Sequence, residues 1–295
     1  MAINSTPVVI LGSNGFVGSK VTQLLEKNSL HVLKPSSREL DILNYPSLLA
    51  FFNKHKSQVV INFAAYTDVE EAEKQRGNKN SISWKLNVKG PKNLAKLCSK
   101  YNTFLIHIST DSVFYDFKKY PRGFEESTVP KAYLTRLTWY GYTKLLGEKQ
   151  LAKSKIKLAI VRISYPFGNL KSKKDFILKT IHYIKTNVPF FKDFYFTPTF
   201  IPDLAETIEK IAKFKKSGIY HITSPNITTP YKIALYIAKK LNLKNTIKSQ
   251  SLNDYIKNKI VPKRPKYSNL NNIRTRKLLN VKFHNWQKAI DELYA

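Results

Sequence analysis

Residues 8–18 read VVILGSNGFVG, and this stretch decides the fold. Four consecutive apolar residues, three of them β-branched, predict a fully buried strand. Glycines follow at positions 12, 15 and 18, and the amphipathic run from Val17 to Lys27 predicts a helix. A strand, a glycine turn and a helix N-terminus in this order predict a diphosphate-binding site, because the helix dipole and the free N–H groups favour negative charge.

Each glycine of this turn has an expected role. Gly12 permits the tight turn, Gly15 lets backbone N–H groups approach the phosphates, and Gly18 lets helix and strand pack closely. An ordinary βα turn that contains glycine is the alternative, and the strand–turn–helix context favours nucleotide binding. The cofactor-binding residues expected here are Gly12, Asn14, Gly15, Phe16, Val17 and Gly18.

The alternation of strand and helix continues through the first half of the chain. Strands are expected at 30–33, 58–65, 104–109 and 158–163, and helices at 45–54, 82–101 and from about 140 to 153. This alternation predicts an α/β fold, a Rossmann-type doubly wound parallel sheet. We expect residues 1–169 to form this NAD(P)-binding domain.

The pattern loosens beyond residue 170. Helices are expected at 176–185, 203–214, 230–241 and 286–294, a short strand at 218–222, and irregular structure with a short helix at 245–267. Because no βαβ repeat is visible here, residues 170–295 are expected to form mainly a smaller substrate-binding cap. Segments 170–200 and 220–295 should supply most of it, with some segments returning to the Rossmann core.

The residues after the second strand predict which nicotinamide cofactor binds. In NAD-binding folds an acidic residue near this point contacts the ribose 2′-hydroxyl. Here Lys34, Ser36, Ser37 and Arg38 provide cationic and hydroxyl groups that suit a 2′-phosphate. NADPH is therefore favoured, and NADH remains an alternative because Glu39 lies close by.

Further cofactor contacts are expected along the same edge of the sheet. Asp41, followed by Ile42, could accept a hydrogen bond from the adenine amino group, and a helix cap or a turn is its alternative role. Ala64 and Ala65 end the third strand, where small side chains leave room for a ligand.

Tyr140 and Lys144 carry the expected chemistry. Their spacing of four residues places a phenol and an ammonium on one face of a helix. We expect the ammonium to lower the pKa of the phenol, so that the tyrosine exchanges a proton with a carbonyl or an alcohol. Thr110 ends the fourth strand and can hydrogen-bond the same oxygen. Tyr236 and Lys240 share the spacing but lack this placement after the fourth strand.

The length and composition limit the size of the core and exclude several classes of protein. Its 295 residues can bury one large core or two modest ones. The chain has no apolar run near the roughly 20 residues that a membrane helix needs, and no signal-peptide pattern. A single cysteine, Cys98, excludes an internal disulfide and a cysteine-rich zinc site. We expect no membrane association, no metal centre and a reducing, cytoplasmic location.

The charge is unusual, with Lys+Arg 50, Asp+Glu 20 and a formal net charge of +30. A polyanion partner such as nucleic acid is one interpretation. The other is a lysine-rich surface that also suits an anionic small substrate. The basic residues are scattered from Lys20 to Lys288 with no arginine-rich block, which favours the second. Nucleic-acid binding is therefore expected only as weak, non-specific binding at low salt.

The chain resembles the extended short-chain dehydrogenase/reductases, and most closely the dTDP-4-dehydrorhamnose reductase family. The stretches that carry the resemblance are 12–18, 37–42, 60–67, 107–114, 140–145, 197–199, 203–205, 218–221 and 264–268. They run the length of the chain, so the resemblance is to a whole protein.

The resemblance implies a function and a set of residues. It implies reduction of a 4-keto-6-deoxy nucleotide sugar by NADPH, with NADH as the alternative cofactor and no metal. Thr110, Tyr140 and Lys144 form the implied catalytic set, with Asp111 as the acidic residue after the threonine. Further implied contacts are Tyr140, Lys144, Ala64, Ala65 and Tyr66 with the cofactor, and Thr110, Tyr165 and Arg264 with the substrate.

The chain also departs from this family. The connection from Pro130 to Tyr140 is longer than usual and carries residues 131–136 in place of a proline-asparagine run. The bifunctional epimerase–reductases have a cysteine just after the fourth strand, and Ser112 stands in that region here, which argues against epimerase activity. Another sugar-nucleotide epimerase or dehydratase, and a non-catalytic NADP-binding subunit like that of methionine adenosyltransferase, are the alternatives. The nucleotide, the sugar and the oligomeric state, including a homodimer, stay open.

Overall fold

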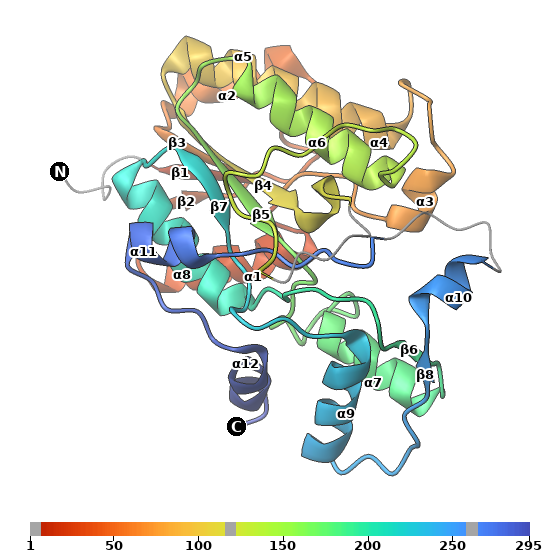
Figure 1. The fold of residues 1–295 in the computed structure, drawn as a ribbon. Helices are drawn as coiled ribbons and strands as arrows, with labels where there is room; N and C mark the ends of the chain where they lie inside the picture. The colour runs from red at the N-terminus through yellow and green to blue at the C-terminus, as the bar shows by residue number, and fades with distance from the viewer. Residues whose placement is uncertain (1–6, 116–121, 258–264) are drawn as a thin grey trace.

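The structure is a computed structural model that describes residues 7–115, 122–257 and 265–295. Within these residues, a six-stranded sheet lies at the centre of the molecule, in the order β2-β1-β3-β4-β5-β7 (Figure 1). All neighbouring strands are parallel, which confirms the predicted doubly wound α/β fold. The strands are β1 (Val8–Leu11), β2 (Val32–Leu33), β3 (Val59–Asn62), β4 (Phe104–Thr110), β5 (Leu158–Ile163) and β7 (Gly218–His221).

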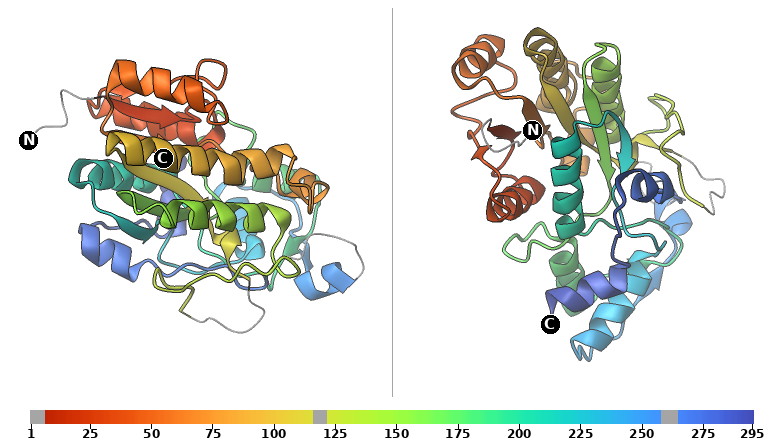
Figure 2. Two further views of the ribbon diagram at one scale, coloured as in Figure 1. Left: turned by 90° about the horizontal axis from the view of Figure 1, so that it is seen from above. Right: turned by 90° about the vertical axis from the view of Figure 1, so that its left-hand side faces the viewer.

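Two layers of helices enclose the sheet (Figures 1 and 2). The alternation of side chains along β1 shows why: Val8 and Ile10 lie in one core, and Val9 and Leu11 lie in the other. On the first face are α1 (Phe16–Lys27), α8 (Ile201–Phe214) and α11 (Ile273–Leu279). On the second are α2 (Tyr45–His55), α5 (Gly90–Tyr101) and α6 (Trp139–Ala152).

The helix expected over 82–101 is a continuous helical segment of changing geometry. It consists of α4 (Ile82–Trp84), a π-helical turn at Lys85–Lys89 and α5. Pro91 has no N–H to donate to the carbonyl of Asn87 four residues earlier, which interrupts the α-helical ladder at this point. The π turn buries Asn87, as such turns frequently do at functional sites.

The second half of the chain divides between a cap and the sheet. The cap has an aromatic core and contains α7 (Phe176–Lys185), α9 (Pro230–Lys240), α10 (Leu252–Lys257) and α12 (Trp286–Leu293). A short parallel pair, β6 (Phe190–Phe191) and β8 (Ser249–Gln250), also belongs to it. Figure 1 shows the cap elements gathered on one side of the sheet.

The strand expected at 218–222 is present as β7, but one expectation for this half was wrong and one helix was not predicted. No βαβ repeat was visible, yet β7 pairs parallel with β5 as an edge strand of the main sheet. The cap elements inserted between these strands hid the repeat. Residues 273–279 form α11, which was not predicted, and the adjoining Val281 and Phe283 belong to the core around β1. Within the described ranges, none of the helices has both the length and the apolarity to cross a membrane.

Candidate functional site

The glycine turn is packed directly against the end of β3. Gly12 has φ +75°, and a Cβ there would lie 2.6 Å from the backbone nitrogen of Ala64, so both the turn and the close approach require glycine. A Cβ on Gly18 would lie 2.3 Å from the Gly12 carbonyl oxygen, which is the close helix packing expected of this position. The turn and β3 therefore meet at the carboxyl edge of the sheet.

The N-terminus of α1 is left open to solvent beside this turn. Its N-cap is Gly15, no side chain caps it, and no acidic residue lies in its first turn. Asn14 and Gly15 are exposed, whereas Phe16 and Val17 are half-buried. An uncapped helix N-terminus at the point where the strand order reverses, between β1 and β3, fits a diphosphate.

Asn87 ties the end of β3 to the helix that carries Tyr140. Its amide oxygen accepts from the Tyr66 backbone N–H at 2.9 Å, and its amide nitrogen donates to the Tyr66 carbonyl and to Thr143 Oγ1, each at 3.0 Å. The predicted ligand contacts Ala64, Ala65 and Tyr66 are all half-buried at this edge. Asn87 lies in the helix expected over 82–101, but no role was predicted for it; a polar amide among the apolar positions of a helix is the signal that could have identified it.

Thr110 and Tyr140, which lie 30 positions apart in the chain, meet at the end of β4. The Thr110 hydroxyl lies close enough to the Tyr140 phenol to lower its pKa, and it donates to Asp111 Oδ1 at 3.0 Å. Asp111 is buried, and its second oxygen accepts from Ser164 Oγ at 2.7 Å. Burial raises the pKa of Asp111, and the hydroxyls around it partly offset that rise. The predicted set of Thr110, Asp111 and Tyr140 is thus brought together.

The expectation that Lys144 lowers the pKa of the Tyr140 phenol was wrong. Burial raises the pKa of Tyr140 to about 12; the hydrogen bond with Thr110 acts against this rise, and the charge of Asp111 adds to it. Desolvation of the phenolate is the largest effect, and the Lys144 ammonium instead donates to the Ile108 carbonyl. A tyrosine with this pKa keeps its proton at neutral pH and is suited to donate it.

Lys144 lies on the same helix with its ammonium turned toward β4. Its Nζ donates to the Ile108 carbonyl at 2.7 Å and lies 3.4 Å from His107 Nε2. Burial lowers the pKa of Lys144 to about 8, and the charge of Glu148 opposes that fall. Burial and the nearby Lys144 also lower the pKa of His107, which was not predicted as a site residue.

The residues after β2 lie in two hydrogen-bonded turns. Ser37 and Arg38 are exposed, and a Glu39 carboxylate oxygen accepts from the Ser36 N–H at 2.7 Å. Asp41 Oδ1 accepts from the Leu43 N–H at 2.9 Å, which is the turn role named as its alternative. Ile42 is buried against Gly90.

A pocket opens next to Asp111 and Ser112, between core and cap. Tyr165, a predicted substrate contact, lines it together with Phe194 of the cap. Arg136, Leu137 and Thr138 also line it, and these come from the long connection for which no role was predicted. Arg264, the other predicted substrate contact, lies outside the described residues.

Comparison with known proteins places this geometry among nucleotide-sugar reductases. The family described as RmlD substrate binding domain matches residues 6–295. The dTDP-4-dehydrorhamnose reductase of Aggregatibacter actinomycetemcomitans is 28% identical over 98% of both chains. The crystal structure of the Bacillus anthracis dTDP-4-dehydrorhamnose reductase in complex with NADP superposes with a TM-score of 0.86, at 25% identity and 98% coverage of both chains. Methionine adenosyltransferase 2 subunit beta of Xenopus laevis is 28% identical, over 82% of this chain and 74% of that one.

Proposed function

This chain belongs to the RmlD substrate binding domain family, and on that premise we propose that it reduces the 4-keto group of a nucleotide-linked 4-keto-6-deoxy sugar with NADPH. The observation that carries the proposal is that Thr110 and Tyr140 come together at the sheet edge where the glycine turn also lies. A protonated phenol held by a hydroxyl, next to a pocket and a nucleotide cradle, fits carbonyl reduction.

Each residue of the set has a proposed role. NADPH, when bound, supplies the hydride that reduces C4. Tyr140 donates its proton to the carbonyl oxygen, and the Thr110 hydroxyl orients that oxygen. Lys144 binds the ribose hydroxyls through its ammonium, and Asp111 holds Thr110 through the hydrogen bond between their side chains. Tyr165 is proposed to contact the sugar nucleotide from the pocket wall, and Arg264 to bind its phosphates.

The cofactor cradle is proposed to consist of the glycine turn, Ala64, Ala65, Tyr66 and the turns after β2. The missing Cβ atoms at Gly12 and Gly18 and the uncapped start of α1 fit a diphosphate. Ser37 and Arg38 are exposed where a 2′-phosphate would be bound, and Asp41 and Ile42 follow them. The Glu39 carboxylate accepts a hydrogen bond from the Ser36 N–H, so it is less available to the ribose 2′-hydroxyl of NADH.

Wild-type protein is expected to prefer NADPH to NADH, and Arg38→Ala to lose most of that preference. A charge-assisted hydrogen bond to the 2′-phosphate contributes about 1.5–3 kcal/mol, or roughly 10- to 150-fold in affinity. The measurement is kcat/KM with each cofactor, and Arg274→Ala serves as a control that removes an exposed arginine elsewhere. Equal use of both cofactors by wild type and by Arg38→Ala would refute the assignment.

NADPH affinity is expected to weaken above pH 8, by up to about tenfold per pH unit, because Lys144 has a pKa of about 8 and loses its charge there. Fluorescence titration of NADPH between pH 7 and 9.5 measures this, and Lys144→Met should bind weakly with no such dependence. Unchanged wild-type affinity across this range would contradict the role of Lys144.

The same shift in pKa affects stability. The unfolded chain keeps the Lys144 proton up to the ordinary pKa of 10.5, whereas the folded chain loses it near pH 8. The contribution of Lys144 to the free energy of unfolding therefore rises with pH between 8 and 10.5.

The function itself is tested by NADPH oxidation across dTDP-, UDP- and GDP-linked 4-keto-6-deoxy sugars, with product stereochemistry read by NMR. Turnover of at least one of them is the expected result. A regulatory subunit is the second candidate, favoured by the likeness to the Xenopus protein. Protein that binds NADPH, oxidises none with any keto-sugar and instead captures a methionine adenosyltransferase would support that candidate.

The remaining assignments concern partners and location. We propose that the net charge of +30 serves an anionic sugar nucleotide and that nucleic acid is bound only weakly and without sequence preference. A homodimer is compatible with the proposal and is not required by it. The single cysteine, Cys98, is buried and suits a reducing compartment, so a cytoplasmic location is proposed.

A further inference from the structure

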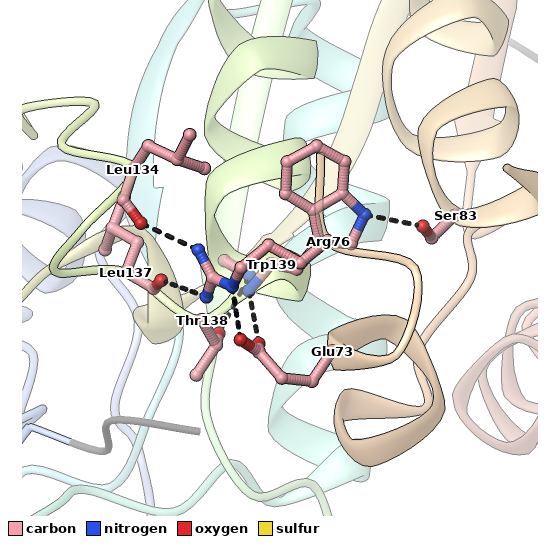
Figure 3. Close-up of polar contacts among 8 residues, drawn as sticks. Glu73, Arg76, Ser83, Leu134, Leu137, Thr138 and Trp139 are labelled. Atoms are coloured by element: carbon pink, nitrogen blue, oxygen red, sulfur yellow. Dashed lines mark hydrogen bonds and ion pairs between the residues drawn. The ribbon is translucent and has the colours of Figure 1, made fainter. Parts of the chain in front are cut away.

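The long connection before α6 is bound to a helical turn that follows β3. Within the connection, Arg136 N and Leu137 N both donate to the Tyr133 carbonyl and so form a turn over 133–137. The carbonyls of Leu134 and Leu137 then accept from one guanidinium, that of Arg76 (Figure 3). Arg76 Nη1 lies 2.7 Å from the Leu134 oxygen, and Nη2 lies 2.9 Å from the Leu137 oxygen.

Glu73, at the end of α3 (Val69–Glu73), completes this arrangement. One of its carboxylate oxygens accepts from Arg76 Nε, and the other accepts from the Trp139 backbone N–H at 2.9 Å (Figure 3). Trp139 is the first residue of α6, so its N–H has no partner within the helix. A carboxylate at this end also interacts favourably with the helix dipole.

The first turn of α6 matters because it carries Tyr140. Helix ends fray, and Tyr140 is the second residue of this helix. The turn is held by the Thr138 hydroxyl, which accepts from the Gly141 N–H at 3.1 Å, and by the Glu73 carboxylate. Trp139 Nε1 adds a bond to Ser83 Oγ at 2.9 Å, and its ring stacks on Trp84.

We propose that Glu73 and Arg76, here called the clamp, are positioning residues that set the place of the Tyr140 hydroxyl for proton donation. The clamp joins the β3 edge to the start of α6 and also fixes Leu137 and Thr138, which line the pocket. The inference rests on the proposed function, because it assigns Tyr140 as the proton donor.

The test compares Arg76→Ala with Lys74→Ala. Lys74 pairs with Glu71 in the same part of the chain, at 2.6 Å, and this exposed pair makes no bond to the connection in the described residues, so it is a matched control. Arg76→Ala is expected to lower kcat about 10- to 100-fold, because a misplacement near 1 Å costs that much. NADPH affinity and the urea midpoint of unfolding should stay within the range of the control.

Two further variants distinguish positioning from loss of fold. Arg76→Lys should recover only part of kcat, because an ammonium lacks the planar fork that reaches two carbonyls. Glu73→Gln retains an acceptor for the Trp139 N–H, so its kcat should fall less than that of Arg76→Ala. If Arg76→Ala does not fold, these two variants test the same proposal, and wild-type kcat in both would overturn it.

Hydrogen exchange provides a readout that does not depend on turnover. The amides of Trp139 and Gly141 should exchange faster in Arg76→Ala than in Lys74→Ala, because the first turn opens more often. Wild-type protein that oxidises no NADPH would refute the proposed function, while exchange would still test the clamp. Active wild type with equal kcat, or with equal exchange, in Arg76→Ala and Lys74→Ala would overturn the clamp.

Discussion

Replacing Tyr140 with phenylalanine is expected to lower kcat by about 10²- to 10⁴-fold, the usual contribution of a general acid. The phenol carries a proton at neutral pH, burial raises its pKa further to about 12, and the variant has no proton to give. NADPH affinity should change by less than about twofold, since the glycine turn and Lys144 remain. The measurement is steady-state kinetics combined with fluorescence titration of NADPH.

The control for this variant is Tyr236→Phe. Tyr236 and Lys240 repeat the four-residue spacing on α9, but the Tyr236 hydroxyl bonds Asp291 at 2.9 Å, away from the sheet edge. Turnover should be unaffected there, because spacing without Thr110 nearby provides no chemistry. A Tyr140→Phe protein that retains more than a small fraction of wild-type kcat would remove Tyr140 from the mechanism.

Removing Arg162 alone is expected to lower the free energy of unfolding by about 3–5 kcal/mol, because it leaves a buried charge unpaired. Arg162 on β5 and Glu148 on α6 form a two-pronged ion pair, with Nε–Oε1 at 3.1 Å and Nη2–Oε2 at 2.7 Å. Their side chains are 1% and 5% exposed. The pair joins the helix that carries Tyr140 and Lys144 to the sheet.

Urea unfolding of Arg162→Met, Glu148→Leu and the double variant measures this effect. The double variant should recover most of the loss, since apolar side chains of similar volume can replace a buried ion pair at little cost. A loss below about 1 kcal/mol for Arg162→Met, or a double variant as unstable as the sum of the single ones, would show that burial of the pair has been misjudged.

Much of the fold follows from local sequence. The β-branched run at 8–11 and the glycines at 12 and 18 predict a buried strand and a tight turn, because these depend on few residues. The meeting of Thr110 with Tyr140 followed from topology, since the helix that comes after a parallel strand begins at the edge where that strand ends. In contrast, the edge strand β7 was missed as part of the main sheet, because cap elements separate it from β5.

The energetics of the site could not be predicted in the same way. The pKa of Tyr140 depends on how much water the surrounding elements exclude, and a spacing rule contains no such information. The clamp joins Arg76 to a carbonyl 61 positions away, and Arg162 lies 14 positions from Glu148. Such contacts are set by packing of whole elements and leave no periodic signal along the chain.

Transfer of a single isotope from NADPH to the sugar tests the proposed reduction most directly. Protein is incubated with NADPH that carries deuterium at the transferable C4 position of the nicotinamide, together with a dTDP-4-keto-6-deoxy sugar, and the product is examined by NMR. The proposed reaction predicts one deuterium on C4 of the sugar, at the carbon whose oxygen Tyr140 protonates, and about 10²- to 10⁴-fold slower formation of this product by Tyr140→Phe. Product without deuterium at C4, or bound NADPH that is never oxidised by any such sugar, would contradict it.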